Sequence, residues 1–206
     1  MNVIEDETKA NVEEENVVEL DKIESEEVEQ NKEFDLKYTI RTVANWPKPG
    51  IMFRDITTLL QNPKAFNHCI QKFKDRYSKQ NISKIAGIES RGFIFGAALA
   101  RELNLPFVLI RKKGKLPAET ISHEYALEYG TDTIEIHKDA ISVGENVLII
   151  DDLIATSGTL NAACKLVEKL GGKVYECALV IELLDLNGRE KMKDYKVFSL
   201  IQFEGK

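Results

Sequence analysis

The sequence predicts an α/β protein with a central parallel sheet of about five strands and helices on both faces. Short apolar runs alternate with longer segments whose apolar residues recur every three or four positions. The run NVLIID at residues 146–151 is apolar on both faces, as in a buried parallel strand. No internal repeat of roughly 20–50 residues is visible. The 206 residues therefore suit one domain with a sizeable core, alone or with a tail.

The first elements of this domain are a helix, a strand and a second helix. We expect the first helix over residues 62–80, where Asn62 is a typical N-cap and Pro63 a typical first helical residue. Its apolar positions have helical spacing: Phe66, Ile70, Phe73 and Tyr77. The apolar run 85–88 predicts a strand. The pattern FIFGAALARELN that follows predicts a second amphipathic helix.

The remaining elements continue the alternation. The run LPFVLI at 105–110 predicts a strand that leads into a loop rich in Lys, Arg and Gly. Residues 118–140 are polar, alternating and rich in Thr and Tyr, which indicates a hairpin or a mobile flap. A helix over 160–170 is expected to end at Gly171-Gly172. Strand-like runs close the chain at 174–183 and 196–202.

The net charge of -6 conceals two different segments. Residues 1–35 hold 14 acidic residues and 3 lysines, a net charge of -11, so residues 36–206 have a net charge of +5. The acidic segment buries too little apolar surface to offset its ordering entropy, so we expect a disordered or loosely helical extension. The alternative is an amphipathic helix that packs against a partner through Val17, Leu20, Ile23 and Val28. The basic segment suits a small anionic ligand and lacks the dense stripe of a nucleic-acid surface.

Several classes of protein are excluded or disfavoured. No apolar run approaches the roughly 18 residues of a membrane span, and the acidic start is unlike a secretory signal. The GxxxxGK[ST] and GxSxG patterns of ATPases and serine hydrolases are absent, and no HExxH zinc motif is present. Three scattered cysteines are expected to be buried and reduced in a cytoplasmic protein: Cys69, Cys164 and Cys177.

The most informative segment is VLIIDDLIATSGT at residues 147–159. A buried strand ends in Asp151 and Asp152, and a small-residue loop and a helix follow. Ligands bind beyond the carboxyl ends of strands in open α/β sheets, and a helix N-terminus binds anions. Gly158 allows close approach of a phosphate, while the two acids should face sugar hydroxyls or a divalent cation. The segment therefore predicts a site for a ribose 5-phosphate.

This segment resembles the phosphoribosyl diphosphate motif of the type I phosphoribosyltransferases. Further segments resemble the adenine phosphoribosyltransferases within that family: WPKPGIMFRDIT (46–57), GIESRGFIFGAALA (87–100), RKKGKLPAET (111–120), LEYGTDTIEIHKDA (127–140), VIELLDLNGREK (180–191) and VFSLIQF (197–203). The likeness covers about residues 36–203 in one order. It implies the type I phosphoribosyltransferase fold, with a mobile flap and a small hood formed by the N-terminal body region and the C-terminal strand.

The resemblance also implies a reaction and its partners. Adenine and phosphoribosyl diphosphate, with Mg²⁺, would give AMP and diphosphate by substitution at the anomeric carbon through an oxocarbenium-like transition state. A homodimer is implied, in which Arg111 reaches into the neighbouring site. No nucleic-acid or membrane partner is implied. Two alternatives stay open: transfer to hypoxanthine, guanine or xanthine, and a purine-sensing regulator that retains the fold. The Asp151-Asp152 pair disfavours the first, and the acidic extension disfavours DNA binding by the second.

The resemblance assigns roles to individual residues around the sugar and the diphosphate. Asp151 and Asp152 would hold the ribose hydroxyls, and they are the candidate contacts for Mg²⁺, direct or through water. The residues implied to hold the 5-phosphate are Ala155, Thr156, Ser157, Gly158 and Thr159. The residues implied to face the diphosphate are Arg91, Arg111, Lys115 and Tyr129, with Lys112 and Lys113 left open. Family members often have Gly where Ser157 stands, which puts a glycine-specific backbone geometry there in doubt.

The remaining assignments concern catalysis and the base. The resemblance implies that Glu128 is the catalytic carboxylate that handles a purine proton as N9 attacks. It implies a base pocket in which Phe53 stacks on adenine, backbone groups at Met52 and Arg54 read the purine edge, and Leu183 covers the other side of the ring. Asp55 is expected to pair with Arg54 or to cap a turn.

Overall fold

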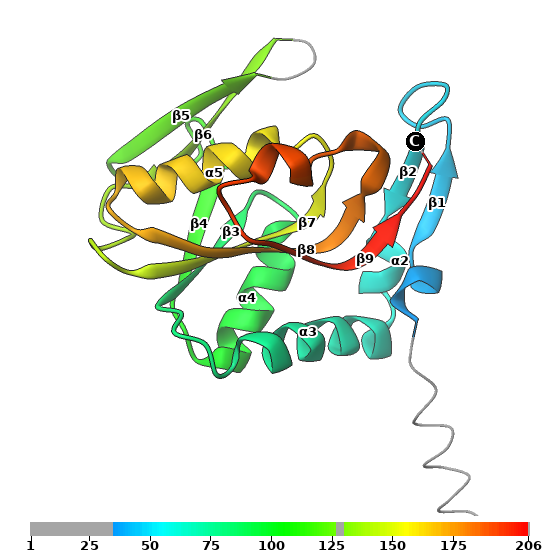
Figure 1. The fold of residues 1–206 in the computed structure, drawn as a ribbon, viewed down its shortest axis with the longest axis horizontal. Coiled ribbons are helices and arrows are strands. Elements are labelled where there is room, and N and C mark those ends of the chain that lie inside the picture. The colour runs from blue at the N-terminus through cyan, green and yellow to red at the C-terminus, as the bar shows by residue number, and fades with distance from the viewer. Residues whose placement is uncertain (1–34, 127–129, 206) are drawn as a thin grey trace, which may run out of the picture. The chain divides into compact units, whose positions relative to one another are not determined.

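The structure is a computed structural model that describes residues 35–126 and 130–205. Of the two units Met1–Asp35 and Leu36–Lys206, the second holds the fold described below (Figure 1). The expected disorder or helix in the acidic extension falls on residues 1–34, outside the described residues, and stays a prediction. Among the described residues, no helix is both long and apolar enough to cross a membrane.

A seven-stranded sheet with the order β5-β6-β4-β3-β7-β8-β9 forms the centre of the domain. Five neighbouring strands are parallel: β4 (Phe107–Lys112), β3 (Lys84–Ile88), β7 (Asn146–Ile154), β8 (Lys173–Leu183) and β9 (Val197–Phe203). The predicted parallel sheet of about five strands is thus confirmed. The predicted hairpin is also present, as β5 (Thr120–Ala126) and β6 (Thr131–His137), which extend the sheet beyond β4 in antiparallel pairing.

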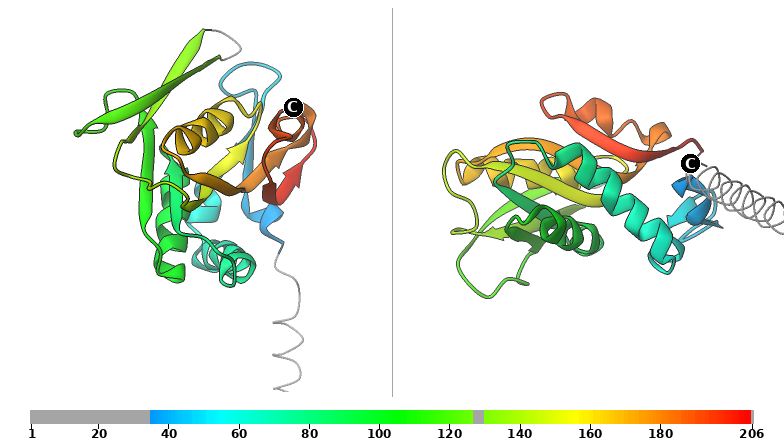
Figure 2. Two further views of the ribbon diagram at one scale, coloured as in Figure 1. Left: turned by 60° about the vertical axis from the view of Figure 1, so that its left-hand side comes forward. Right: turned by 90° about the horizontal axis from the view of Figure 1, so that it is seen from below.

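Helices cover both faces of the sheet, as predicted (Figures 1 and 2). One face carries α3 (Pro63–Tyr77) and α4 (Gly92–Leu103), and the other carries α5 (Gly158–Lys169). The Asn62 side chain accepts hydrogen bonds from the backbone N–H groups of Lys64 and Ala65, which confirms the predicted cap. Each face has its own core. The fully buried side chains of the first core include Phe73, Phe95 and Leu99, and those of the second include Cys164, Leu166 and Val167.

The three cysteines are all free and buried in these cores. Cys164 Sγ lies 3.5 Å from Cys177 Sγ, between α5 and β8. Burial raises the pKa of the Cys69 thiol above its usual range. The expectation that the three cysteines are buried and unpaired is therefore confirmed, and all three pack as small apolar side chains.

A second, two-stranded sheet forms the hood. Its strands β1 (Arg41–Ala44) and β2 (Met52–Asp55) are antiparallel and pair Arg41 with Asp55. The hood is preceded by the 3₁₀ helix η1 (Leu36–Thr39) and followed by α2 (Thr57–Leu60). The expectation that the C-terminal strand is part of the hood is wrong, because β9 is the edge strand of the main sheet. The chain after β9 still reaches the hood, since Arg54 donates a hydrogen bond from Nη2 to the Glu204 carbonyl.

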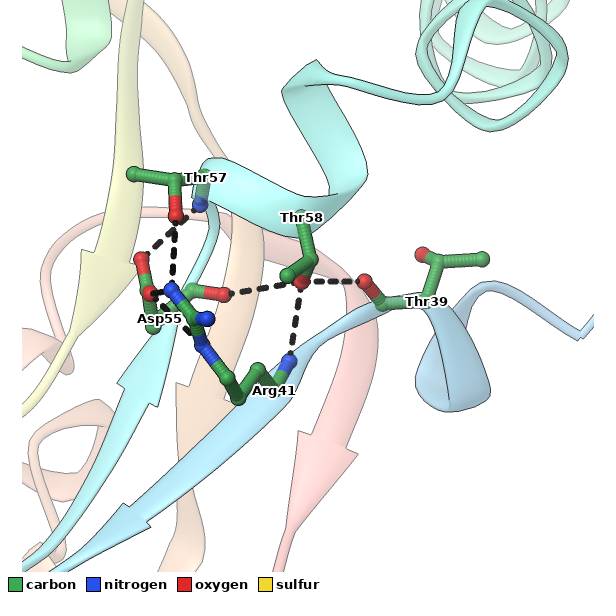
Figure 3. Close-up of polar contacts among 5 residues, drawn as sticks. All are labelled: Thr39, Arg41, Asp55, Thr57 and Thr58. Carbon is green, nitrogen blue, oxygen red and sulfur yellow. Dashed lines mark hydrogen bonds and ion pairs between the residues drawn. The ribbon is translucent and has the colours of Figure 1, made fainter.

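Polar contacts fasten the hood to η1 and α2 (Figure 3). Asp55 accepts hydrogen bonds from the Arg41 guanidinium and, at 2.9 Å, from the Thr57 N–H. Thr58 Oγ1 accepts from the Arg41 N–H at 3.0 Å and donates to the Thr39 carbonyl at 2.6 Å. The Arg41 side chain and the Thr57 N–H lower the pKa of Asp55 to about 2. Asp55 thus caps a turn as expected, but its partner is Arg41 rather than Arg54.

Two further 3₁₀ helices follow β8. They are η2 (Leu184–Leu186) and η3 (Arg189–Met192), and they connect β8 to β9. Arg189 at the start of η3 turns back to the buried Glu182 on β8, to which it donates from Nε at 2.7 Å. Glu182 also accepts hydrogen bonds from Ser199 and Gln202 on β9. This cluster joins the C-terminal ends of the last two strands of the sheet.

Candidate active site

A cavity of about 640 Å³ lies at the carboxyl ends of β3 and β7. This is the edge of an open α/β sheet at which ligands bind. The cavity is lined by Arg91 and by seven predicted residues of the 147–159 motif: Asp151, Asp152, Ala155, Thr156, Ser157, Gly158 and Thr159. It also contains polar residues that were not assigned: Glu89, Ser90, Lys112, Tyr125 and Asp132. The described part of one wall comes from the β5–β6 hairpin.

The end of β7 places two carboxylates side by side. Asp151 Oδ1 accepts the Asp152 N–H at 2.9 Å, and Asp152 is 3% exposed. Arg91 Nε lies 2.9 Å from Asp152 Oδ2, as an ion pair without hydrogen-bond geometry. Burial raises the pKa of both carboxyls; the charge of Asp152 adds to the rise at Asp151, while Arg91 opposes the rise at Asp152. The pair therefore favours a ligand that brings hydroxyl donors or positive charge.

The loop after β3 brings Arg91 to this carboxylate pair. It contains a cis peptide bond between Glu89 and Ser90, and α4 begins at Gly92. A Cβ atom on Gly92 would lie 2.6 Å from the Ile150 carbonyl oxygen and 3.0 Å from Asp151 Oδ1. Only glycine lets α4 begin so close to the end of β7. This close approach sets the distance between Arg91 and the two aspartates.

The loop after β7 leads directly into α5. The first intrahelical hydrogen bond there runs from the Asn161 N–H to the Ser157 carbonyl. The N–H groups of residues 158–160 therefore stay available at the positive end of the helix dipole, which favours an anion. Ser157 has φ 69° and ψ 0°, in the left-handed region, and donates from Oγ to the Thr156 carbonyl at 2.6 Å. Serine thus adopts the backbone geometry that had been in doubt for a non-glycine residue.

The hairpin side of the cavity carries a chain of polar contacts. Thr159 Oγ1 donates to the Tyr125 hydroxyl at 3.0 Å, and this hydroxyl lies 3.4 Å from Asp132 Oδ2. Lys112 Nζ lies 3.5 Å from the same Asp132 oxygen. Lys112, which the sequence left open, therefore lines the cavity. No sequence signal marked Tyr125 or Asp132, apart from their place in an alternating strand pattern.

Arg111 near the end of β4 and Lys115 in the loop after it form hydrogen bonds within the chain. Arg111 donates from Nε and Nη2 to the Glu89 carboxylate at 3.2 and 2.9 Å, and this contact lowers the pKa of Glu89. The backbone N–H of Lys115 donates to the buried Glu135. Neither Arg111 nor Lys115 lines the cavity. Their assigned contact with diphosphate stays a prediction, as does the reach of Arg111 into a second subunit.

The predicted base-binding residues lie beside the cavity rather than in its lining. The Phe53 ring is 6.0 Å from Arg91 Cζ and forms an edge contact with Trp46, which is half exposed. Met52 is 37% exposed at the start of β2. The Arg54 side chain points to the C-terminal segment, with Cζ 4.3 Å from the Phe203 ring centroid. Leu183 ends β8 and is partly buried against the core.

Glu128 and Tyr129 lie outside the described residues, between the two strands of the hairpin. Their neighbours on each strand are described, and Tyr125 and Asp132 both line the cavity. The assigned roles of Glu128 and Tyr129 stay predictions.

Comparison with known proteins identifies the family. The family model described as "Phosphoribosyl transferase domain" matches residues 55–206. A protein of Desulfosudis oleivorans named adenine phosphoribosyltransferase is 61% identical over 171 residues, which are 83% of this chain and 99% of the relative. The chain belongs to the phosphoribosyltransferase family.

Solved phosphoribosyltransferase structures have the same fold. The adenine phosphoribosyltransferase of Thermoanaerobacter pseudethanolicus is 50% identical, with a TM-score of 0.79 over 82% of this chain and 98% of that chain. The Saccharomyces cerevisiae enzyme is 42% identical, with a TM-score of 0.77 over 81% of this chain and 97% of that chain. That structure holds an imino-altritol bisphosphate and adenine. The predicted type I phosphoribosyltransferase fold is confirmed.

Proposed function

We propose that this chain transfers the phosphoribosyl group of phosphoribosyl diphosphate to adenine, giving AMP and diphosphate. The observation that carries the proposal is the shared cavity of the Asp151-Asp152 pair, the 155–159 loop and Arg91. A sugar phosphate with a second anionic group matches this arrangement of donors and acceptors. The choice of adenine is supported by the 61% identical relative and by the adenine in the yeast structure.

The 155–159 loop holds the 5-phosphate. Free N–H groups at the start of α5 and the hydroxyls of Thr156 and Thr159 supply donors, so no lysine is needed at this position. The Asp151 and Asp152 carboxylates accept hydrogen bonds from the ribose hydroxyls. Their negative charge also favours positive charge that develops at the anomeric carbon in the transition state.

The diphosphate faces Arg91. Its guanidinium presents a planar fork that can donate to two phosphate oxygens, and its side chain is 45% exposed and lines the cavity. Lys112 adds a second positive charge to the same cavity. Arg111 and Lys115 complete the cradle if a second copy of the chain brings them to the site. During the reaction, the bond between the anomeric carbon and the diphosphate oxygen breaks, and the electron pair leaves with diphosphate.

The residues of the site fit Mg²⁺. Asp152 Oδ2 is buried and has only the Arg91 ion pair, so a hard oxygen ligand is available. Among the described residues there is no group of three or more His, Cys, Asp or Glu that could enclose a metal. Mg²⁺ suits such a site because it keeps several waters and binds one or two carboxylates together with substrate phosphates. When bound, it neutralises charge on the diphosphate.

The base lies between the hood and the end of β8. Phe53 stacks on adenine, backbone groups at Met52 and Arg54 read the purine edge, and Leu183 covers the other side. The contact of Phe53 with Arg91 supports this placement, because it joins the hood to the diphosphate side of the cavity. N9 attacks the anomeric carbon, and Glu128 takes the purine proton. A closed hairpin excludes water that would compete for the same carbon.

A homodimer in the cytoplasm completes the proposal. Ile94 on α4 is 40% exposed and Leu109 on β4 is 38% exposed, and these apolar side chains are available for contact with a partner. Analytical ultracentrifugation of the full chain tests the dimer, and a monomer at micromolar concentration would exclude it. An Arg111→Ala variant then tests whether the partner contributes to the site. Mixing it with a variant that lacks Glu128 would restore activity only if sites are shared.

The decisive experiment supplies phosphoribosyl diphosphate, Mg²⁺ and a mixture of adenine, hypoxanthine, guanine and xanthine. We expect AMP as the product. IMP, GMP or XMP would keep the sugar phosphate site and refute the base pocket. No product, with phosphoribosyl diphosphate still bound, would favour a regulator. A Glu128→Gln variant should lose most of its turnover while it keeps its affinity for phosphoribosyl diphosphate; near-normal turnover would exclude the role of Glu128.

A further inference from the structure

We propose that Tyr125 is a positioning residue for the sugar 5-phosphate, acting through the Thr159 hydroxyl. The inference rests on the proposed function of the 155–159 loop as the phosphate site. Thr159 Oγ1 and the Tyr125 hydroxyl are 3.0 Å apart, and both residues line the cavity. Tyr125 comes from β5 and Thr159 from α5, so the contact joins the hairpin to the phosphate loop.

The hairpin is fixed along α5 at two points. At one end of α5, Lys169 Nζ donates to the Ser122 carbonyl at 3.1 Å. At the other end, the Tyr125 ring lies against Gly158, since a Cβ atom there would be 3.3 Å from Tyr125 Cδ2. Figure 1 shows the hairpin above α5. These contacts hold Tyr125 in place next to the first turn of the helix, where the phosphate binds.

The hydrogen bond between the Thr159 and Tyr125 hydroxyls can reverse its direction when an anion binds. In the structure, Thr159 donates to Tyr125, and the Tyr125 hydroxyl lies 3.4 Å from the acceptor Asp132. A hydroxyl has one proton to donate and accepts two hydrogen bonds. When Thr159 turns its proton to a phosphate oxygen, Tyr125 can donate to Thr159 in its place. The short contact between the hydroxyls is kept, and only the longer one to Asp132 is lost.

This reversal makes Tyr125 favour phosphate binding. A hydroxyl that accepts a hydrogen bond becomes a better donor, so a Tyr125–Thr159–phosphate chain is cooperative. The contact also keeps the Thr159 side chain in one orientation before the ligand binds, which lowers the entropic cost of binding. When Asp132 loses the Tyr125 hydroxyl, its carboxylate keeps two other partners. Lys112 Nζ lies 3.5 Å away, and the Thr133 N–H donates to it at 2.8 Å.

A double-mutant cycle on Tyr125→Phe and Thr159→Val tests the proposal. Tyr125→Phe keeps the ring on Gly158 and removes only the hydroxyl. We expect ribose 5-phosphate, titrated by calorimetry, to bind roughly 3- to 10-fold more weakly to each single variant. The double variant should bind little more weakly than Thr159→Val alone, because the two hydroxyls act together. Tyr175→Phe is the matched control, since the Tyr175 hydroxyl donates to Gln80 away from the cavity.

Steady-state kinetics separate positioning from a loss of structure. Tyr125→Phe should raise the KM for phosphoribosyl diphosphate by a similar factor, with kcat within twofold and the KM for adenine unchanged. Unchanged or tighter ribose 5-phosphate binding, or additive effects in the cycle, would overturn the proposal. If the wild-type chain formed no AMP, the proposed function would fall, while the ribose 5-phosphate cycle would still decide the role of Tyr125.

Discussion

Arg91 Nε lies 2.9 Å from Asp152 Oδ2, and this ion pair joins the loop after β3 to the end of β7. In the proposed function, one partner faces diphosphate and the other faces the ribose, so the pair spans the bond that breaks. Burial raises the pKa of both carboxyls and the charge of Asp152 adds to the rise at Asp151, while Arg91 opposes the rise at both. Keeping these two carboxylates next to each other therefore lowers the stability of the ligand-free fold.

The Asp151→Asn variant should reveal this loss of stability. Removing the charge of Asp151 beside the buried Asp152 is expected to raise stability at pH 7.5 by about 1 kcal/mol, or about 2–4 °C in Tm. The same change removes a charged acceptor for a ribose hydroxyl. Affinity for ribose 5-phosphate should therefore fall by about tenfold or more.

Scanning calorimetry and titration of the same samples check this prediction. Asp75→Asn on α3 is the matched control, because Asp75 is exposed and remote from the cavity. An Asp151→Asn variant that is less stable than the wild type would show that Asp151 contributes to folding. Unchanged affinity for ribose 5-phosphate would refute its contact with the sugar.

Ser157 offers a test of backbone strain in the phosphate loop. Its φ of 69° disfavours any residue with a Cβ atom, whereas glycine adopts it freely. Ser157→Gly and Ser157→Ala both lose the hydroxyl that donates to the Thr156 carbonyl. We therefore expect the Gly variant to be more stable than the Ala variant by about 1 kcal/mol. Urea unfolding measures the difference; equal stabilities would mean that the loop relaxes away from this φ.

The parts of the site that the sequence predicted are those that lie within continuous motifs. Asp151, Asp152 and the 155–159 loop follow one strand directly, and Arg91 follows another. Parallel pairing of β3 with β7 then brings the two motifs to the same edge of the sheet. For such residues, the order of elements along the chain is enough to place them in one cavity.

The contacts that the sequence analysis missed depend on the register between neighbouring strands. Tyr125 meets Asp132 because the hairpin pairs these two residues directly. Arg111 binds Glu89 from the adjacent parallel strand rather than the cavity. Asp55 meets Arg41 because β1 and β2 pair them, while Arg54, its neighbour in sequence, points to the other face of the strand. A pattern of residue types does not determine these pairings.

The placement of β9 was missed for a related reason. Residues 197–203 have an apolar pattern that suits either the hood or the edge of the main sheet. The deciding contacts are those of Glu182 on β8, which accepts from Ser199 and Gln202 on β9 and from Arg189 on η3. A buried acid with three partners is recognised only once the strands are paired.

Glu182 should also control stability at acid pH. Arg189, Ser199 and Gln202 lower its pKa to about 2, against 4.5 for a free glutamate. Because the folded-state pKa is lowered, its contribution to stability is present above about pH 4.5 and is lost as the pH falls toward 2. Arg189 is 43% exposed, so solvent screening reduces the contribution to about 2 kcal/mol at pH 7.

The Glu182→Gln variant measures this contribution. We expect a lower Tm at pH 7 by about 4–8 °C, with the difference from the wild type narrowing between pH 4.5 and 2. Glu168→Gln is the control, because Glu168 pairs with Lys165 at a surface where both side chains are 43% exposed. A difference in Tm that is constant with pH would show that packing, not charge, gives Glu182 its effect.

The hood gives a final prediction that separates base binding from stability. Asp55 holds the end of β2 through Arg41 and the Thr57 N–H (Figure 3). Phe53 lies two residues earlier on the same strand. Asp55→Asn should loosen this strand and raise the KM for adenine by roughly 3- to 10-fold, with the KM for phosphoribosyl diphosphate within twofold. The loss of stability should stay below about 1 kcal/mol, since Arg41 is 58% exposed.

Glu119→Gln is the control for this prediction, because it removes an ion pair with Lys138 in which both side chains are largely exposed. That variant should change neither KM nor Tm. If Asp55→Asn lowered Tm and left the KM for adenine unchanged, the hood contacts would stabilise the fold without positioning the base. If it raised both KM values equally, the hood would act on the diphosphate side too, through the contact of Phe53 with Arg91.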